Sequence, residues 1–379
     1  MGVLDGIKVV EIASARPSTF CGMFLADLGA EVTTIERPAA DAGQPRPWEI
    51  CNRGKRSMIL NLKQPEAVDA VLKLIEGADA LIEGMRPGVM ERLGLGPDVC
   101  LARRPCLVYG RLTGWGQSGP LSHAAGYDST FAAVSGATWV STQAGERPEP
   151  PLGLLAGVGG GALYLTFGLL AALFRARVDG HGQVVDAAMV DGAANMLNLM
   201  LSLIIPYRGG SFELARPNSY GKFYARSYRC ADGEWIRLEA DEPHFYAELI
   251  KCLGLDEDER FVRAQQHPEA WQALSAELDS LFATKTRNEW CELFKGTDAC
   301  FAAILSPPEA AVHPHNAERG IYTTVDGVLQ AVAAPRFSAI PLSGPARVPA
   351  RGTHTNSVLS ELGFTSQQLE ELTKSGALG

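Results

Sequence analysis

The sequence predicts an α/β protein with an open parallel-sheet large domain and a smaller α+β domain. Strand-like and helical segments alternate from the N-terminus to Leu112, and two long apolar helical segments follow. The composition changes near residue 206, where Gly and Pro become frequent, and charged amphipathic segments come next. Alternation of this kind indicates an open α/β sheet. A chain of 379 residues exceeds one typical core, so two domains are expected.

The first elements form a strand–helix–strand unit. Ile7–Ile12 is typical of a strand, Ser18–Leu28 of a helix that Gly29 ends, and Glu31–Ile35 of a second strand. Such a unit within thirty or so residues implies parallel strands joined by a right-handed crossover. The pattern repeats with a helix at Pro65–Ile75 and strands at Ser57–Leu62, Ala80–Glu83 and Cys106–Leu112.

The rest of the chain gives the domain boundaries. Two apolar helices, Ala162–Arg177 and Ala187–Leu203, flank a strand at Gln183–Asp186. We expect a large domain over 1–205, a linker over 206–222, a small α+β domain over 223–324 and a segment, 325–379, that returns to the large domain. The small domain should hold a hairpin, Ala225–Cys230 with Trp235–Glu239, and helices His244–Leu253 and Glu269–Ala283; the last segment should end in a helix, Ser366–Thr373.

Composition excludes several classes of protein. A net charge of −9 argues against a nucleic-acid partner. Eight scattered cysteines without a C-x-x-C pair predict reduced thiols in a cytoplasmic protein, and no His, Cys or carboxylate grouping has the spacing of a metal site. The N-terminus does not match a signal peptide. The uncharged stretch Pro150–Phe174 is glycine-rich in its first half, and its uninterrupted apolar part is too short to span a bilayer, so we expect a buried helix and no membrane partner.

Several collinear motifs do carry a resemblance. The turn after the first strand, Ala13–Ser18, lacks G-x-G-x-x-G, which argues against a dinucleotide. The informative stretches are Gly22–Val32 with Ile35–Pro38, Asn52–Ser57, Leu60–Lys63, Glu83–Gly88, Glu91–Gly94, Gly114–Pro120, Gly180–Gly192 and His313–Gly320. In these the chain resembles the α-methylacyl-CoA racemase / family III CoA-transferase superfamily. The resemblance is greatest to the racemase branch, notably in Arg147–Pro151 and Glu242–Tyr246.

The resemblance implies a fold, an assembly and a substrate. It implies the family III CoA-transferase fold and an interlocked homodimer, with each site between the large domain of one subunit and the small domain of the next. The substrate would be an acyl-CoA thioester, with coenzyme A as part of the substrate, no covalently bound cofactor and no metal. The sequence does not indicate the acyl group.

Basic residues are frequent in the N-terminal quarter, at Arg37, Arg53, Lys55, Arg56, Lys63, Arg86 and Arg92. Arginine forks suit the phosphates of coenzyme A, although spacing alone is more typical of solvated surface charges. The resemblance selects four of them as coenzyme A ligands, Arg37, Lys63, Arg86 and Arg92, and adds Leu60, Gly159 and Gly160.

The two positions that carry the family's proton transfer are altered. The resemblance implies a His and an Asp on opposite faces of the α-carbon, and this chain has Tyr127 and Gly157 there. Glycine has no side chain to act as base or nucleophile, and tyrosine, with an ordinary pKa of about 10, is a poor base at neutral pH. The remaining candidates are Asp128, which could instead cap a helix, and Glu242, which could be a carboxylate at a helix N-terminus. His123 and Asp241 lie close enough in sequence to compensate.

Three functions remain open. The first is an acyl-CoA-thioester-processing enzyme, racemase-like or transferase-like, with altered enolate or proton-transfer chemistry through Tyr127, Asp128 and Glu242. The second is a catalytically inactive CoA-ester-binding subunit that forms a heterodimer with an active paralogue. The third is a CoA-ester sensor without a partner.

Overall fold

The computed structural model describes residues 2–142, 146–151, 153–208 and 221–378, and the side chains of 204–208 are not part of that description. The chain divides into two compact units: unit 1 holds residues 1–138, 149–198 and 314–379, and unit 2 holds residues 139–148 and 199–313. Most of the expected linker, 206–222, lies outside the described residues. The boundaries expected at 205, 223 and 325 therefore stay predictions.

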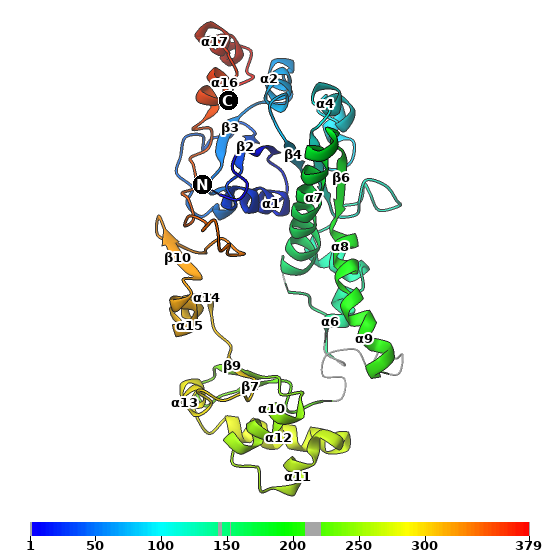
Figure 1. Cartoon of the computed structure of the whole chain (residues 1–379), viewed down its shortest axis with the longest axis vertical. Coiled ribbons are helices and arrows are strands. Elements are labelled where there is room, and N and C mark those ends of the chain that lie inside the picture. Colours follow the sequence, from blue (N-terminus) through cyan, green and yellow to red (C-terminus); the bar gives the residue numbers. More distant parts are fainter. Residues whose placement is uncertain (1, 143–145, 152, 209–220, 379) are drawn as a thin grey trace. The chain divides into compact units, whose positions relative to one another are not determined.

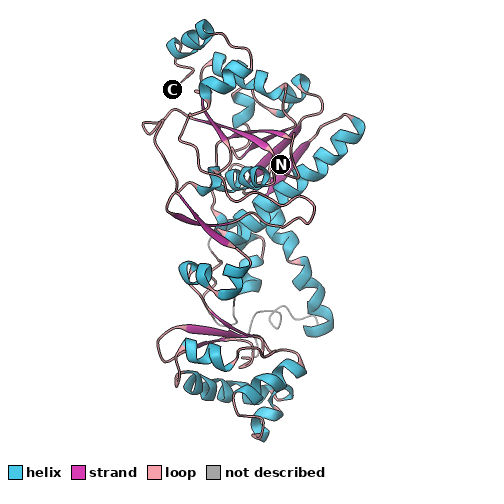
Figure 2. Ribbon diagram, turned by 60° about the vertical axis from the view of Figure 1, so that its left-hand side comes forward, coloured by secondary structure: helices cyan, strands magenta, loops and turns pink. Residues whose placement is uncertain are grey.

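Unit 1 is built on a six-stranded parallel sheet. Its strand order is β3-β2-β1-β4-β5-β6, with helices on both faces (Figures 1 and 2). The predicted α/β class with an open parallel sheet is confirmed. The strands are β1 Lys8–Ile12, β2 Glu31–Glu36, β3 Arg56–Ile59, β4 Ala80–Glu83, β5 Val108–Thr113 and β6 Val184–Ala188.

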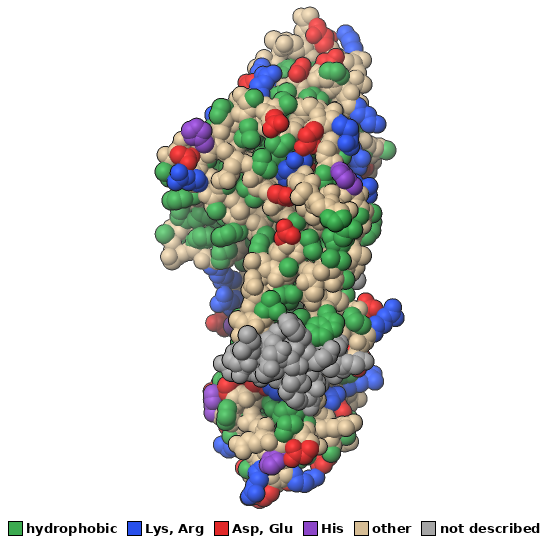
Figure 3. Space-filling view, turned by 90° about the vertical axis from the view of Figure 1, so that its right-hand side faces the viewer, with side chains coloured by type: hydrophobic (Ala, Val, Ile, Leu, Met, Phe, Trp, Pro, Cys, Tyr) green, Lys and Arg blue, Asp and Glu red, His purple; other side chains and the backbone are tan. Residues whose placement is uncertain are grey.

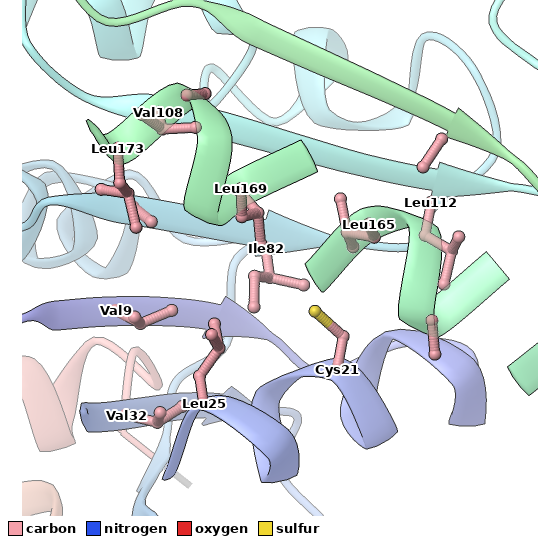
Figure 4. Packing of buried hydrophobic residues seen from close by; sticks show 14 of the residues in the cluster. Val9, Cys21, Leu25, Val32, Ile82, Val108, Leu112, Leu165, Leu169 and Leu173 are labelled. Atoms are coloured by element: carbon pink, nitrogen blue, oxygen red, sulfur yellow. The ribbon is translucent and has the colours of Figure 1, made fainter. Parts of the chain in front are cut away.

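One face of the sheet is covered by α1 (Arg16–Asp27) and α7 (Tyr164–Asp179). Figure 4 shows Cys21 and Leu25 of α1 and Leu165, Leu169 and Leu173 of α7 packed against strand residues such as Val9 and Ile82. On α7 the buried leucines recur every four residues, which places them on a single stripe of the helix. This burial of apolar surface is what fixes α1 and α7 on the sheet.

The opposite face is covered by α2 (Pro65–Ile75), α4 (Pro97–Arg103) and two C-terminal helices, α16 (Thr355–Glu361) and α17 (Ser366–Lys374). Helix α2 buries Ala67, Ala70, Val71 and Ile75, a helical spacing that brings one apolar stripe onto the sheet. The bounds of α2 and β4 match the sequence prediction. Helix α16 was not predicted, because its short sequence carries little apolar periodicity.

The glycine-rich stretch differs from the prediction in form. Leu154–Leu163 is a π-helix, η2, and α7 continues it without a break. The second apolar helix is divided into α8 (Met189–Met196) and α9 (Asn198–Arg208). The backbones of η2 and α8 approach each other closely: a Cβ at Gly160 would lie 2.5 Å from the nitrogen of Ala193, and one at Gly192 would overlap the carbonyl oxygen of Gly160. Two helix backbones can approach this closely only where the residue in contact is glycine, which has no Cβ.

The helix formed by η2 and α7 also bears on the membrane question. Leu154–Asp179 has 26 residues and is long and apolar enough to cross a membrane by length and composition, alone in this respect among the residues described. It packs on β5 and supplies part of the unit 1 core, with 44% of its most apolar window buried. Burial of one side of this helix in the unit 1 core explains why its sequence is so apolar.

Unit 2 contains a three-stranded antiparallel sheet, β7 (Ser227–Arg229), β8 (Trp235–Leu238) and β9 (Phe301–Ala303). The predicted hairpin is therefore present. An aromatic core, including Phe223, Tyr228, Phe282 and Trp290, packs this sheet against helices. Those helices are α10 Pro243–Cys252, α11 Glu259–Val262, α12 Trp271–Phe282 and α13 Arg287–Leu293.

The remaining elements are short. In unit 1 a hairpin of β10 (Tyr322–Val325) and β11 (Val328–Ala331) follows α15 (Pro314–Glu318). The others are η1 Ile50–Asn52, α3 Val89–Arg92, α5 Asp128–Val134, α6 Ala137–Ser141, η4 Ala264–Gln266, η5 Pro268–Ala270 and α14 Pro307–Val312.

Candidate functional site

The candidate site lies at the carboxyl edge of the unit 1 sheet. Strands β1 and β4 are neighbours, and the chain leaves them toward opposite sides of the sheet, since β2 and β3 lie on one side and β5 and β6 on the other. In an open α/β sheet, ligands bind beyond the carboxyl ends at such a switch point. The loop after β1 and the loop after β4 line two separate cavities here.

The larger cavity, which we call the arginine cleft, has a volume of about 620 Å³. Arg16, at the start of α1, and Arg37, directly after β2, are both exposed along it. Trp48 is 68% exposed on the same wall. A cleft with two exposed guanidinium groups and an aromatic ring suits a phosphorylated ligand with a planar base. Its remaining lining residues are Ala13, Ser14, Thr19, Glu36, Glu49, Ile50, Cys51, Asn52 and Arg351.

The smaller cavity, which we call the tyrosine cavity, has a volume of about 230 Å³ and mostly apolar walls. Tyr127 lines it and is 83% exposed, and Arg86 lies at the loop after β4. Trp115 and Phe131 form another wall, with ring centroids 4.8 Å apart in an edge-to-face arrangement. The cavity therefore combines a phenol, a cation and apolar surface. Sequence reasoning identified Tyr127 and Arg86 here but missed Trp115 and Phe131.

Asp128 follows Tyr127 as the first residue of α5, and its carboxylate is held by the glycine-rich π-helix. Oδ2 accepts a hydrogen bond from the N–H of Gly153 at 3.2 Å, and Oδ1 accepts one from the N–H of Gly157. A Cβ at Gly157 would lie 3.1 Å from that Oδ1. These contacts agree with the alternative interpretation of Asp128 as a helix cap. A carboxylate near a helix N-terminus, here that of η2, accepts hydrogen bonds from N–H groups that have no partner inside the helix.

The basic residues divide into two groups. Arg53 is paired with Asp27 at 2.5 Å, Lys55 with Glu11 at 2.6 Å, and Arg56 with Glu361 at 2.6 Å. These three serve the fold. The four that the resemblance selected, Arg37, Lys63, Arg86 and Arg92, are exposed and have no ion pair to any residue that the structure describes. Arg37 lines the arginine cleft and Arg86 lines the tyrosine cavity, whereas Lys63 and Arg92 line neither of the two.

The other three residues selected as coenzyme A ligands are less open. The side chain of Leu60 is fully buried in the core, and its N–H donates to the carbonyl oxygen of Glu36 at 2.9 Å. Gly159 and Gly160 belong to η2, where Gly160 is pressed against α8. Helix packing by itself explains why glycine occupies position 160.

A buried ion pair contacts Thr19, one of the residues that line the arginine cleft. The Nζ of Lys55 also donates to the carbonyl oxygen of Thr19 on α1 at 2.8 Å, and both members of the Lys55–Glu11 pair are fully buried. A Cβ at Gly22 would overlap a carboxylate oxygen of Glu11, so α1 can lie this close only with glycine there. Burial raises the pKa of the neighbouring Cys21 thiol to about 12, which keeps it protonated and unreactive.

A second buried pair lies below the loop after β4. Arg111 Nε donates to Glu83 at 2.8 Å. Burial raises the pKa of the Glu83 carboxyl, and the N–H of Met85 and the charge of Arg111 partly offset this. The hydrogen bond from the N–H of Met85 to Glu83 holds the loop after β4. Arg86, the next residue, is the exposed cation that this loop brings to the tyrosine cavity.

Glu242 belongs to unit 2. It precedes α10, is exposed, and makes no side-chain capping hydrogen bond. Its neighbour Asp241 is paired with Lys222 at 2.6 Å, and His123 is an exposed loop residue of unit 1. Within the described ranges no three His, Cys, Asp or Glu side chains are grouped as metal ligands would be.

This geometry defines an open α/β protein with an arginine-lined cleft and a second, more apolar cavity at one sheet edge. The sequence profile described as CoA-transferase family III matches residues 4–355. The chain belongs to this family, which confirms the resemblance inferred from the motifs.

Individual relatives agree. The chain is 40% identical to mouse "Alpha-methylacyl-CoA racemase" over 98% of its own length and 96% of the relative's. It is 30% identical to "Succinyl-CoA--D-citramalate CoA-transferase" of Chloroflexus aurantiacus, over 97% and 96%. Among solved structures, a CAIB/BAIF family protein from Brucella suis aligns with a TM-score of 0.83 at 26% identity, covering 95% of this chain and 99% of that one.

Proposed function

We propose that this protein processes acyl-CoA thioesters through altered enolate or proton-transfer chemistry. The observation that carries the proposal is the separation of the basic residues. Arg53, Lys55 and Arg56 are used internally, while Arg37, Lys63, Arg86 and Arg92 are exposed without an ion pair to any described residue. Exposed cations beside a crevice suit the phosphates of coenzyme A.

The tyrosine cavity would receive the acyl end. Removing a proton α to a thioester requires a base within hydrogen-bond reach and a donor for the enolate oxygen. The hydroxyl of Tyr127 suits the donor role, because phenols are better acids than bases at neutral pH. Asp128 or Glu242 would supply the carboxylate. Gly157 offers no carboxylate for an acyl anhydride, so a transferase cycle with its nucleophile at that position is excluded from the proposal.

The same proposal includes a homodimer in the cytoplasm. Helix α7 leaves Phe167, Phe174 and Val178 at least 66% exposed, and Figure 3 shows hydrophobic side chains gathered in patches on this side of the molecule. Exposed apolar surface of this kind is typical of an interface with another protein chain. A heterodimer with an active paralogue would cover it equally well.

The test is isotope exchange. The purified protein is incubated with a 2-methylacyl-CoA in D2O, and deuterium at Cα is followed by mass spectrometry. Exchange that falls by about tenfold or more in Tyr127→Phe supports the assigned donor role. Coenzyme A binding with no exchange in the wild type would overturn the catalytic proposal.

A second candidate is the inactive CoA-ester-binding subunit. It is favoured by the contacts of Asp128, whose carboxylate oxygens accept hydrogen bonds from the backbone N–H groups of Gly153, which precedes η2, and of Gly157 within it. Both oxygens of this carboxylate are thus already occupied by backbone N–H groups, which leaves fewer free lone pairs to meet a substrate proton. Tight coenzyme A binding without exchange, together with activation of a co-expressed paralogue, would establish this function in place of the first.

A further inference from the structure

Strand β3 lies at one edge of the unit 1 sheet, and the C-terminal chain closes that edge. The N–H of Ser57 donates to Nδ1 of His354 at 3.0 Å, and the carbonyl oxygen of Ser57 accepts from the N–H of His354 at 2.9 Å. The N–H of Ile59 donates to Oγ1 of Thr355 at 3.0 Å. The outward groups of an edge strand, which would otherwise be unpaired, are therefore satisfied by one short segment.

That segment also forms a wall of the arginine cleft. Arg351 lines the cleft, with its guanidinium 3.3 Å from the carboxylate of Asp41 and 3.7 Å from that of Glu49. Its carbonyl oxygen accepts from the N–H of Gly43 at 2.9 Å. Three residues later the chain reaches His354, so the cleft contacts of Arg351 and the contact of His354 with β3 belong to one short segment.

Only a neutral imidazole can make the contact to Ser57. A backbone N–H needs an unprotonated ring nitrogen as its acceptor, and protonation would put an N–H against an N–H. The charged groups around His354 are Arg56 on β3 and Glu361 on α16; beyond them lie Glu31 on β2 and Lys8 on β1. Burial, and then Arg56, lower the pKa of His354, while Glu361 acts in the opposite direction.

We propose that His354 is an acid-sensitive anchor: its protonation releases residues 350–355 from β3 and thereby weakens ligand binding in the arginine cleft. The ligand part rests on the proposed coenzyme A function, whereas the anchor does not. The direction follows from linkage. A histidine with a lowered folded pKa binds more protons when unfolded or released, so the anchor is stable above about pH 6.5 and weakens as the pH falls below it.

The experiment uses the full-length protein at about pH 7.5 and about pH 5.5. Amide exchange protection of β3 and of residues 350–361, corrected for intrinsic rates, reports the anchor, and calorimetry with coenzyme A reports the cleft. We expect protection of Ser57 and Ile59 to fall about fivefold at the lower pH and the dissociation constant of coenzyme A to rise by a similar factor, as expected for one lost hydrogen bond.

Two variants make the test specific. His354→Asn retains an acceptor near the Nδ1 position but does not titrate, so its protection should be equal at both pH values. Its affinity should change only by the amount that protonation of the 3′-phosphate of coenzyme A causes, since that group has a second pKa of about 6. His181→Asn, at an exposed position of unit 1, should behave like the wild type. Protection of β3 that is independent of pH in the wild type, or that falls equally in His354→Asn, would overturn the anchor. Loss of protection without coenzyme A binding at either pH would support the anchor and contradict the proposed function.

Discussion

The carboxylate of Asp128 accepts a hydrogen bond from the backbone N–H of Gly157, and its Oδ1 lies 3.1 Å from where a Cβ at position 157 would stand. A carboxylate from α5 therefore lies beside the π-helix at this position. A side chain added at position 157 would press against Asp128, and a second carboxylate there would also meet its charge.

The first prediction concerns Gly157→Asp. Two carboxylates at this range repel each other, so the free energy of unfolding should fall by about 1–3 kcal/mol at neutral pH. Part of this loss should be recovered near pH 4, where one carboxyl of the pair takes up a proton, as urea denaturation at the two pH values would reveal. Gly157→Ala is the control for size, and an equal, pH-independent loss in both variants would point to sterics alone.

A gain of activity is the second prediction. Gly157→Asp combined with Tyr127→His should introduce Cα exchange of a 2-methylacyl-CoA, and adding Asp128→Asn should increase it, because the new carboxylate no longer competes for the N–H of position 157. Deuterium incorporation measures both steps. Variants that bind coenzyme A but remain inert would show that the cavity has diverged beyond these positions.

Arg37 and Arg53 form a matched pair for the third prediction. Arg37→Ala should weaken coenzyme A binding by about tenfold with almost no change in stability, since it removes an exposed phosphate ligand. Arg53→Ala should instead destabilise the protein by about 3 kcal/mol, because it leaves the carboxylate of Asp27 largely buried without its partner. Calorimetry and chemical denaturation separate the two effects. Equal losses of affinity and stability in both variants would contradict the division of the basic residues.

The fourth prediction concerns the contact between η2 and α8. Gly192→Ala should lower the free energy of unfolding by about 2–4 kcal/mol, because the new methyl group overlaps the backbone of Gly160. Gly344→Ala is the control, since its added Cβ has no atom within 4 Å. A Gly192→Ala protein as stable as the control would mean that the two helices can separate without cost.

Much of the fold was predictable because it depends on local pattern. The apolar stripe of Pro65–Ile75 and the alternation of strands and helices define unit 1, and both follow from the sequence. The close contact between Gly160 of the π-helix and Gly192 of α8 was not predictable, since the two residues are far apart in the chain. His354 gave no signal either, because its partner Ser57 is 297 residues away.

The candidate site followed the same division. That Tyr127 and Gly157 are altered positions is a prediction from motifs alone, and nothing in the sequence placed Asp128 against Gly157. The sequence also could not show which basic residues form internal ion pairs and which are exposed, because tertiary packing decides which carboxylate each one meets. Lys55 meets Glu11 only after β3 and β1 enter the same sheet.

The contact among Gly22, Glu11 and Lys55 limits how this protein can change over generations. A larger residue at position 22 meets the Glu11 carboxylate, and loss of Lys55 alone leaves that carboxylate buried without a counter-charge. Single replacements at the three positions therefore lead through poorly folding intermediates. Descendants of this chain that lose the ion pair are expected to replace Glu11 and Lys55 together, and only afterwards to accept a side chain in the place of Gly22.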